Sequence, residues 1–190
     1  MAAFSLIELM FVLGVAATLA ATSLPQLAAS VHELRAAGAA RYVAARLQQA
    51  RVRAITRNRE IALRITRDAR GYAVSVVEDG NSNGVLAADI LDGVDSLVGP
   101  PEHLVDQFPG VDFGASNGIP GAEGSTAPGS DPIRLGAADS VTFTPLGTAT
   151  SGSLYLRGEP GIQYVLRIYG ETGRTRILRY NPRTRTWFSR

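Results

Sequence analysis

The sequence has no cysteine, no lysine and only two histidines among its 190 residues. The absence of cysteine excludes a disulfide scaffold, a cysteine-ligated zinc or iron–sulfur site, and a cysteine nucleophile. His32 and His103 are too few for a multi-histidine metal centre. We therefore expect a protein that is not an enzyme and that has no cofactor.

Because lysine is absent, all 19 basic residues are arginine, and they are unevenly distributed. Residues 1–70 have ten arginines and four acidic residues, residues 71–140 have one arginine and eleven acidic residues, and residues 141–190 have eight arginines and two acidic residues. The formal net charge of +2 hides this order. It predicts oppositely charged surfaces on one domain of ordinary size, not a uniformly cationic nucleic-acid binder.

Residues 9–31 carry no charged side chain. A helix of that length, rising about 1.5 Å per residue, can cross the ~30 Å hydrocarbon core of a bilayer. A secretory signal peptide would need a basic segment before the apolar run, but residues 1–8 contain an acid, Glu8, and no arginine. The pattern also continues into helix-forming sequence. We expect a single membrane-anchoring helix that remains part of the protein.

Glu8 lies at the edge of this run, where it is either solvated at the membrane interface or paired, since an unpaired carboxylate in lipid is costly. The segment from Phe4 to Leu13 (FSLIELMFVL) resembles the start of type IV pilins and type II secretion pseudopilins. The resemblance implies that a leader of residues 1–3 is cleaved between Ala3 and Phe4 and that the new amine of Phe4 is methylated. It also implies that Glu8 pairs with the amino terminus of a neighbouring subunit, and that Pro25 bends the helix.

The helical period extends beyond this membrane segment, residues 4–31, to Arg57. Asn58 is a candidate C-terminal cap because asparagine tolerates the left-handed conformation. Residues 32–58 form an amphipathic half that we expect to pack on a soluble head. The stripe that recurs at three- and four-residue steps consists of Val31, Leu34, Gly38, Tyr42, Ala45, Gln49 and Val52.

The head, residues 59–190, is expected to be β-rich, because the hydrophobic period changes from 3.6 to 2 after the helix. A hairpin is predicted from Ile61 to Glu78, with its turn at residues 67–71. Later strands are predicted at Ser140–Thr144, Ser153–Arg157, Gln163–Tyr169, Arg174–Arg179 and Thr186–Ser189. Residues 114–132 are rich in glycine and proline and are expected to form a flexible surface loop. The predicted class is α+β, with the long helix packed against an antiparallel sheet.

Several segments of the second half of the helix and of the head are similar to the type II secretion protein H (GspH/FimT) group of minor pseudopilins and minor pilins. They are Leu47–Arg51, Ala54–Asn58, Val141–Gly147, Gly152–Leu156 and Gly173–Arg176. The resemblance implies a single-pass inner-membrane protein with a periplasmic head, which joins a secretion pseudopilus or a type IV pilus and acts in assembly, at the filament tip and in protein secretion. Its partners would be other (pseudo)pilins, the prepilin peptidase and the inner-membrane assembly platform. A different interpretation is a membrane-anchored periplasmic binding module that never assembles into a filament.

The C-terminus suggests another function. Some minor pilins of this group take up DNA through a Gly-Arg-x-Arg motif, which Gly173, Arg174 and Arg176 match. Arginines with nearby aromatic residues can grip phosphates and stack bases, and the further candidates are Arg179, Arg183 and Arg185. The alternative is that these arginines are solvated or pair with acids of residues 71–140 or of a neighbouring subunit.

Two other motifs are weaker. Asp79, Asn81 and Asn83 match the opening of a calcium loop, in which side-chain oxygens converge on the cation, but the twelfth position is Ile90 and not a bidentate glutamate. A turn after a strand explains them as well. Gly114–Gly118 matches the G-x-S-x-G pattern of hydrolases, but it lies in the glycine- and proline-rich segment with no helical pattern after it, so we attribute it to chance.

Overall fold

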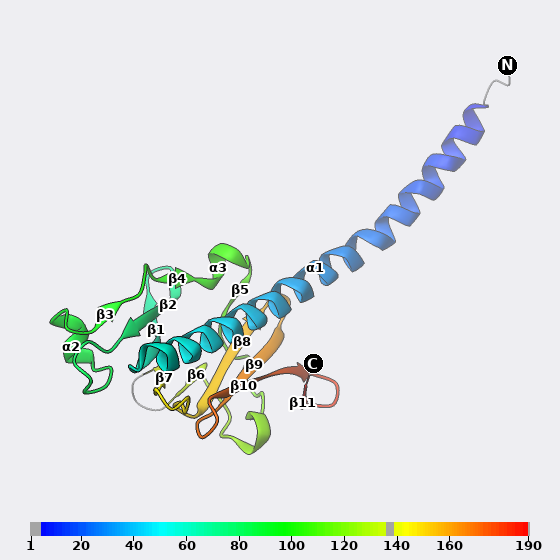
Figure 1. Ribbon diagram of the computed structural model, residues 1–190. Coiled ribbons are helices and arrows are strands. Elements are labelled where there is room, and N and C mark those ends of the chain that lie inside the picture. Colours follow the sequence, from blue (N-terminus) through cyan, green and yellow to red (C-terminus); the bar gives the residue numbers. More distant parts are fainter. Residues whose placement is uncertain (1–4, 136–138, 190) are drawn as a thin grey trace.

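One long helix, α1 (Leu6–Arg57), opens the fold and ends at the predicted cap. The computed structural model describes residues 5–135 and 139–189. Asn58 has left-handed backbone angles, φ 53° and ψ 39°, and its N–H donates to the carbonyl of Ala54. Figure 1 shows that the first half of α1 projects from a β-rich head, whereas the second half lies on it. The predicted continuous helix is therefore confirmed.

The described strands form two antiparallel sheets. The first has the order β3-β2-β1-β7, with β4 beside β2, and consists of β1 (Ile61–Asp68), β2 (Gly71–Glu78), β3 (Ser96–Leu97), β4 (Glu102–His103) and β7 (Ser140–Phe143). The second has the order β11-β10-β9-β8-β5, with β6 beside β8, and consists of β5 (Val111–Phe113), β6 (Ile133–Arg134), β8 (Gly152–Gly158), β9 (Ile162–Tyr169), β10 (Arg174–Asn181) and β11 (Thr186–Ser189).

The predicted hairpin and the five later strands are all present, so the α+β class is confirmed. In the hairpin, the register pairs Ile61 with Glu78 and Asp68 with Gly71, which leaves a two-residue turn. The acidic middle of the chain adds short elements that no periodic pattern predicts. Besides the short strands, these are α2 (Ala87–Leu91), α3 (Leu104–Gln107) and the 3-10 turn η1 (Ala122–Gly124).

The main core lies where the second half of α1 meets the inner faces of both sheets. Its largest fully buried side chains include Leu47 of α1, Phe143 of β7 and Tyr164 of β9. Strand side chains alternate between two faces, and on β8 and β9 both faces are buried. The outer face of the second sheet therefore needs a cover of its own.

Part of the segment 114–132 provides this cover. Ile119 and Ala122 are buried in a second cluster with Tyr155, Val165 and Leu178 of the sheet. The indole N–H of Trp187 donates to the carbonyl of Pro120 at 2.9 Å, and this bond holds the segment in place. The middle of the predicted surface loop therefore packs on an apolar sheet face through two of its side chains. Its flexibility stays a prediction.

Candidate assembly surface

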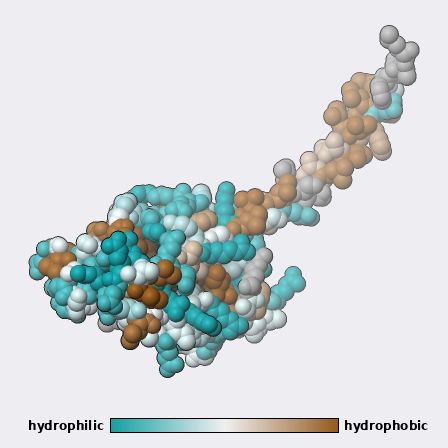
Figure 2. Space-filling model, viewed as in Figure 1, coloured by the Kyte–Doolittle hydropathy of each residue, from teal (hydrophilic) through white to brown (hydrophobic). Residues whose placement is uncertain are grey.

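The first half of α1 is an apolar rod that no described part of the chain covers. By length and composition it can cross a membrane. Figure 2 shows hydrophobic residues along most of this projecting half. Its exposed large side chains are Leu6, Ile7, Leu9, Met10, Phe11, Val12, Leu13, Val15, Leu19, Leu27 and Val31.

The predicted assembly residues lie at the start of this rod and along it. Glu8 is in the first turn of α1, exposed among apolar neighbours. The helix continues through the position of Pro25. Ala3 and Phe4, between which the cleavage is predicted, lie outside the described residues. A carboxylate on an otherwise apolar surface is available to a cation of another chain.

The second half of α1 packs through a different face from the predicted one. In the predicted stripe, Leu34 and Val52 are 68% and 49% exposed. The face that meets the sheets consists instead of Ala36, Ala37, Ala39, Ala40, Val43, Leu47, Ala50 and Ala54. Alanines let the strands approach the helix closely, so the smaller side chains are buried and larger ones remain outside. The predicted packing stripe is therefore wrong for most of its members, which are available to another molecule, whereas Tyr42 packs against the main core.

Ion pairs connect the second half of α1 to the head. Arg53 lies 2.8 Å from Glu78 of β2, and Arg46 lies 2.7 Å from Glu102 of β4. Near the start of the head, Glu33 accepts hydrogen bonds from Arg179 of β10 and from the hydroxyl of Tyr164, at 2.7 and 2.6 Å. No local motif predicts these pairs, because the partners are 25 to 146 residues apart in the chain.

β10 divides the predicted arginine cluster between two faces, because neighbouring strand residues point to opposite sides. Arg179 faces α1, where Glu33 binds it. Arg174 and Arg176 are exposed on the other face, and Arg176 lies 2.8 Å from Glu123. The odd spacing between Arg176 and Arg179 is the sequence signal that could have shown this division.

The remaining arginines of the cluster, Arg183 and Arg185, lie in the exposed turn between β10 and β11. The structure therefore does not bring the five arginines together as one stripe. The pairing of Arg176 with Glu123 is the contact with residues 71–140 that the alternative interpretation predicts.

Gly173, the first residue of the Gly-Arg-x-Arg motif, has a packing reason. Its φ is +60°, and a Cβ there would lie 2.2 Å from the carbonyl oxygen of Gly147 and 2.8 Å from Nε of Arg51. A larger residue would therefore push the turn between β9 and β10 away from α1. The glycine of the motif is explained without a ligand.

The oxygens of the predicted calcium loop are used within the turn. The buried carboxylate of Asp79 accepts hydrogen bonds from the backbone N–H groups of Asn81, Ser82 and Gly84 at 2.7–3.1 Å. The side-chain amides of Asn81 and Asn83 both donate to Asp89. Among the described residues, no group of three His, Cys, Asp or Glu could hold a metal ion. The geometry favours a turn, and calcium binding stays a prediction.

The residues of the hydrolase-like pattern do not come together as a catalytic site. Ser116 accepts a hydrogen bond from the side-chain amide of Gln163 at 3.1 Å. His103 lies in β4, where its Nε2 is 2.8 Å from Asp68. This hydrogen bond lowers the pKa of Asp68, whereas burial raises the pKa of Asp112.

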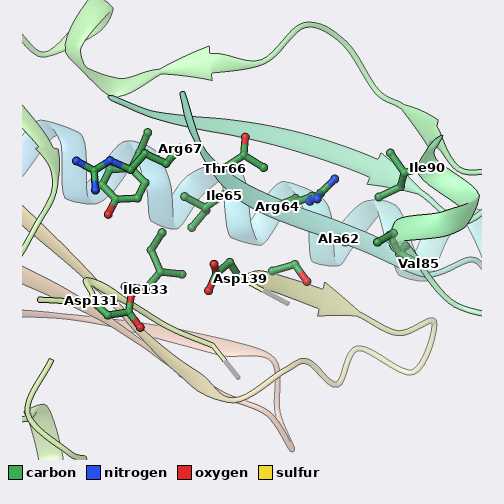
Figure 3. Close-up of a pocket in the computed structure, with 13 residues that line it drawn as sticks. Ala62, Arg64, Ile65, Thr66, Arg67, Val85, Ile90, Asp131, Ile133 and Asp139 are labelled. Carbon is green, nitrogen blue, oxygen red and sulfur yellow. Dashed lines mark hydrogen bonds between the residues drawn. The ribbon is translucent and has the colours of Figure 1, made fainter. Parts of the chain in front are cut away.

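A cavity of about 560 Å³ lies between β1 and the segments of β6 and β7 (Figure 3). Arg64 and Arg67 are on its β1 side, and Asp131 and Asp139 lie opposite them. The guanidinium of Arg67 lies over the ring of Tyr72, 5.7 Å from the ring centroid. Among the described residues that line the cavity there is no histidine, so they form no serine–histidine pair of the hydrolase type.

One of the comparisons with known proteins identifies a family. The family model described as Type II transport protein GspH matches residues 39–173, more than half of the chain. The match does not include the N-terminal motif, so the two resemblances are independent of each other. No curated protein and no solved structure matches the chain. The chain belongs to the GspH family, the pseudopilins of type II secretion.

Proposed function

We propose that the protein is a minor subunit of a type II secretion pseudopilus, acting in filament assembly, at or near the tip, and in protein secretion. The uncovered apolar half of α1 is the observation that carries this proposal. Each large aliphatic side chain left in water forgoes roughly 1.5–3 kcal/mol of burial, so this surface needs a bilayer or a bundle of similar helices around it. A filament subunit occupies both in turn.

The chain would be divided according to these two environments. After removal of residues 1–3, residues 4–31 would anchor it in the inner membrane and later line the filament. Residues 32–58 would carry the periplasmic head, residues 59–190. The prepilin peptidase and the inner-membrane assembly platform would be its partners during maturation, and other pseudopilins in the filament. The exposed stripe on the second half of α1, with Leu34 and Val52, supports contact with these subunits.

Processing gives the first test. We expect the mature protein, isolated from the membrane of its host, to begin at Phe4 and to carry one methyl group on its amine. Intact mass together with N-terminal peptide sequencing by mass spectrometry measures both. In cells that lack the peptidase, the protein should keep residues 1–3. A mature chain that begins at any other residue would contradict the proposal.

DNA uptake is the second candidate function, and one observation favours it: Arg174 and Arg183 are exposed in the C-terminal part of the head. If this region binds DNA, the affinity of the detergent-solubilised full chain should fall with salt, and the log–log slope should shrink by about 0.9 for each phosphate contact removed. The double variant Arg174→Ala/Arg176→Ala should then bind more weakly, whereas Arg35→Ala/Arg41→Ala on exposed α1 positions should not. Absence of binding at low salt would refute DNA uptake and leave the arginines structural.

A further inference from the structure

Arginines from three strands of the second sheet lie in one row, on the face turned away from α1. The residues before and after Arg167 on β9 are buried in the main core, so Arg167 points to the opposite face. The register pairs Arg167 with Ser153 of β8 on one side and with Arg176 of β10 on the other. Ser153 in turn pairs with Arg134 of β6. Directly paired residues share a face of a sheet, so these four side chains form a row across four strands.

The middle arginine of this row has no acidic partner. The outer arginines, on β6 and β10, lie 3.7 Å from Asp131 and 2.8 Å from Glu123. Arg167 is half-buried, and its Nη1 donates to the hydroxyl of Ser153 at 3.0 Å. Among the described residues, no ion pair joins Arg167 to a carboxylate, and its Nε is buried with no hydrogen-bond partner. Like charges opposite each other on neighbouring strands are unfavourable, and so is a half-buried charge without a counterion. An anion beside Arg167 would relieve both costs.

A cavity of about 430 Å³ lies over this part of the row. Arg134, Ser153 and Arg167 line it from the strands. The segment that follows η1 also lines it, through Ser125 and Thr126. The hydroxyl oxygen of Ser125 is buried and has no hydrogen-bond partner in the described part of the chain. Two guanidinium groups and several hydroxyls therefore surround one small space, and all of them can donate hydrogen bonds to an anion.

The charges around the cavity suit one compact anion and not a chain of them. Among the described residues that line it, Asp131 is the one acid, against Arg134 and Arg167. A long polyanion that follows the row would meet Asp131 at one end and Glu123 at the other. A compact anion beside Arg167 instead contacts the guanidinium of the row that no described acid neutralises.

We propose that this cavity binds a single tetrahedral oxyanion, phosphate or sulfate, either free or as the terminal group of a larger molecule. Arg167 supplies the main charge, Arg134 adds a second one, and Ser125 donates its hydroxyl proton. A tetrahedral anion directs oxygens to several sides and so uses donors from the strands and from the covering segment, whereas a planar carboxylate uses fewer of them. The inference goes beyond the proposed function and does not depend on it, because one chain contains the whole site. The site lies on the face opposite α1, so packing of α1 against other subunits leaves it accessible.

Thermal unfolding of the detergent-solubilised full chain tests the site. Phosphate replaces chloride at constant ionic strength, and unfolding is followed by the fluorescence of Trp187, which packs against Tyr155. A ligand that binds only the folded chain raises the melting temperature in a saturable way, by about 5 °C at a concentration tenfold above Kd. The general salt effect of phosphate does not saturate and is common to all variants. Absence of a saturable rise would overturn the proposal.

Three variants assign the effect to the cavity. Arg167→Gln should abolish the saturable rise, because glutamine keeps a donor for Ser153 but carries no charge. Arg134→Gln should weaken the apparent affinity roughly fivefold. The side chain of Arg134 is 42% exposed, so this variant should fold normally and keeps the test decisive if Arg167→Gln does not fold. The matched control is Arg174→Gln, an exposed arginine of the same strand face that is not among the lining residues, and it should leave the affinity unchanged. An affinity that changes equally in all three variants, or in none, would contradict the site.

The Nε of Arg167 reports binding directly. In a chain with isotope-labelled arginine, this buried N–H should exchange slowly with water and give an NMR signal, which is identified by its loss in Arg167→Lys. Phosphate should shift the signal over the same concentration range in which it raises the melting temperature. A signal that stays in place while the melting temperature rises would locate the anion elsewhere and overturn the proposal.

The same two measurements with other anions define the ligand. Sulfate should bind as phosphate does, and acetate at least tenfold more weakly. If glycerol phosphate binds as tightly as phosphate, the site takes the terminal group of a larger molecule, and if it binds tenfold more weakly, the site takes the free ion. Equal binding of acetate would overturn the proposal, because the site would then accept any carboxylate. A response to a short DNA duplex without one to phosphate would also overturn it, because the ligand would then be a polyanion.

Discussion

Replacing Leu47 by alanine is expected to lower the free energy of unfolding of the head by about 2–5 kcal/mol. Leu47 is fully buried on the face of α1 that meets both sheets, in the main core. Truncation removes three carbons that contact several elements and leaves a cavity. The core around it includes strands held in two sheets, so it can close little of the cavity.

The matched control is Val52→Ala, further along the same helix. Val52 is 49% exposed, so its truncation should change the free energy of unfolding by less than about 0.5 kcal/mol. Urea titration of the detergent-solubilised chain, followed by the fluorescence of Trp187, measures both, because that indole packs against Tyr155 and Tyr180. If Val52→Ala lowered the free energy of unfolding more than Leu47→Ala, the buried face of α1 would be the stripe predicted from the sequence.

This pair of variants marks where the sequence was informative and where it was not. Local signals are sufficient for the helix and the strands: Asn58 ends α1, and the alternation from Ile61 to Ile65 begins the sheet. Which face of α1 is buried depends on how closely the strand backbones approach the helix. The sizes of the side chains in the sequence do not give that distance. A search for large apolar residues selects Leu34 and Val52, whereas close packing selects alanines.

The acidic middle of the chain shows a second limit. Its acids hold the head together through contacts between residues far apart in sequence, such as Glu102 with Arg46 and Glu123 with Arg176. A single sequence contains no signal for such pairs. The rod and Glu8 could be predicted because a membrane helix is defined by a continuous local property, its lack of charge. The division of the C-terminal arginines could have been predicted as well, because Arg176 and Arg179 are an odd number of residues apart on one strand.

Glu8→Ala is expected to leave cleavage before Phe4 largely intact and to reduce incorporation into filaments a hundredfold or more. In the proposed assembly, the carboxylate neutralises the amino terminus of a neighbouring subunit inside a bundle of apolar helices. Removing one partner of a buried ion pair costs about 3–5 kcal/mol, because the other charge is left without compensation. Glu8→Gln should have nearly the same effect, since it keeps the size of the side chain but not its charge.

Two measurements on the same cells distinguish processing from assembly. The mature N-terminus is determined by mass spectrometry. Assembly is measured from the amount of subunit in sheared filaments and from disulfide-linked dimers of a chain that also carries Leu13→Cys. Glu159→Ala is the matched control, because it removes an exposed acid from the head and leaves the rod unchanged. Loss of cleavage in Glu8→Ala would place the carboxylate in peptidase recognition. Normal incorporation would contradict its role in the bundle, and the single acid at the edge of the rod would then be explained by its position at the membrane interface.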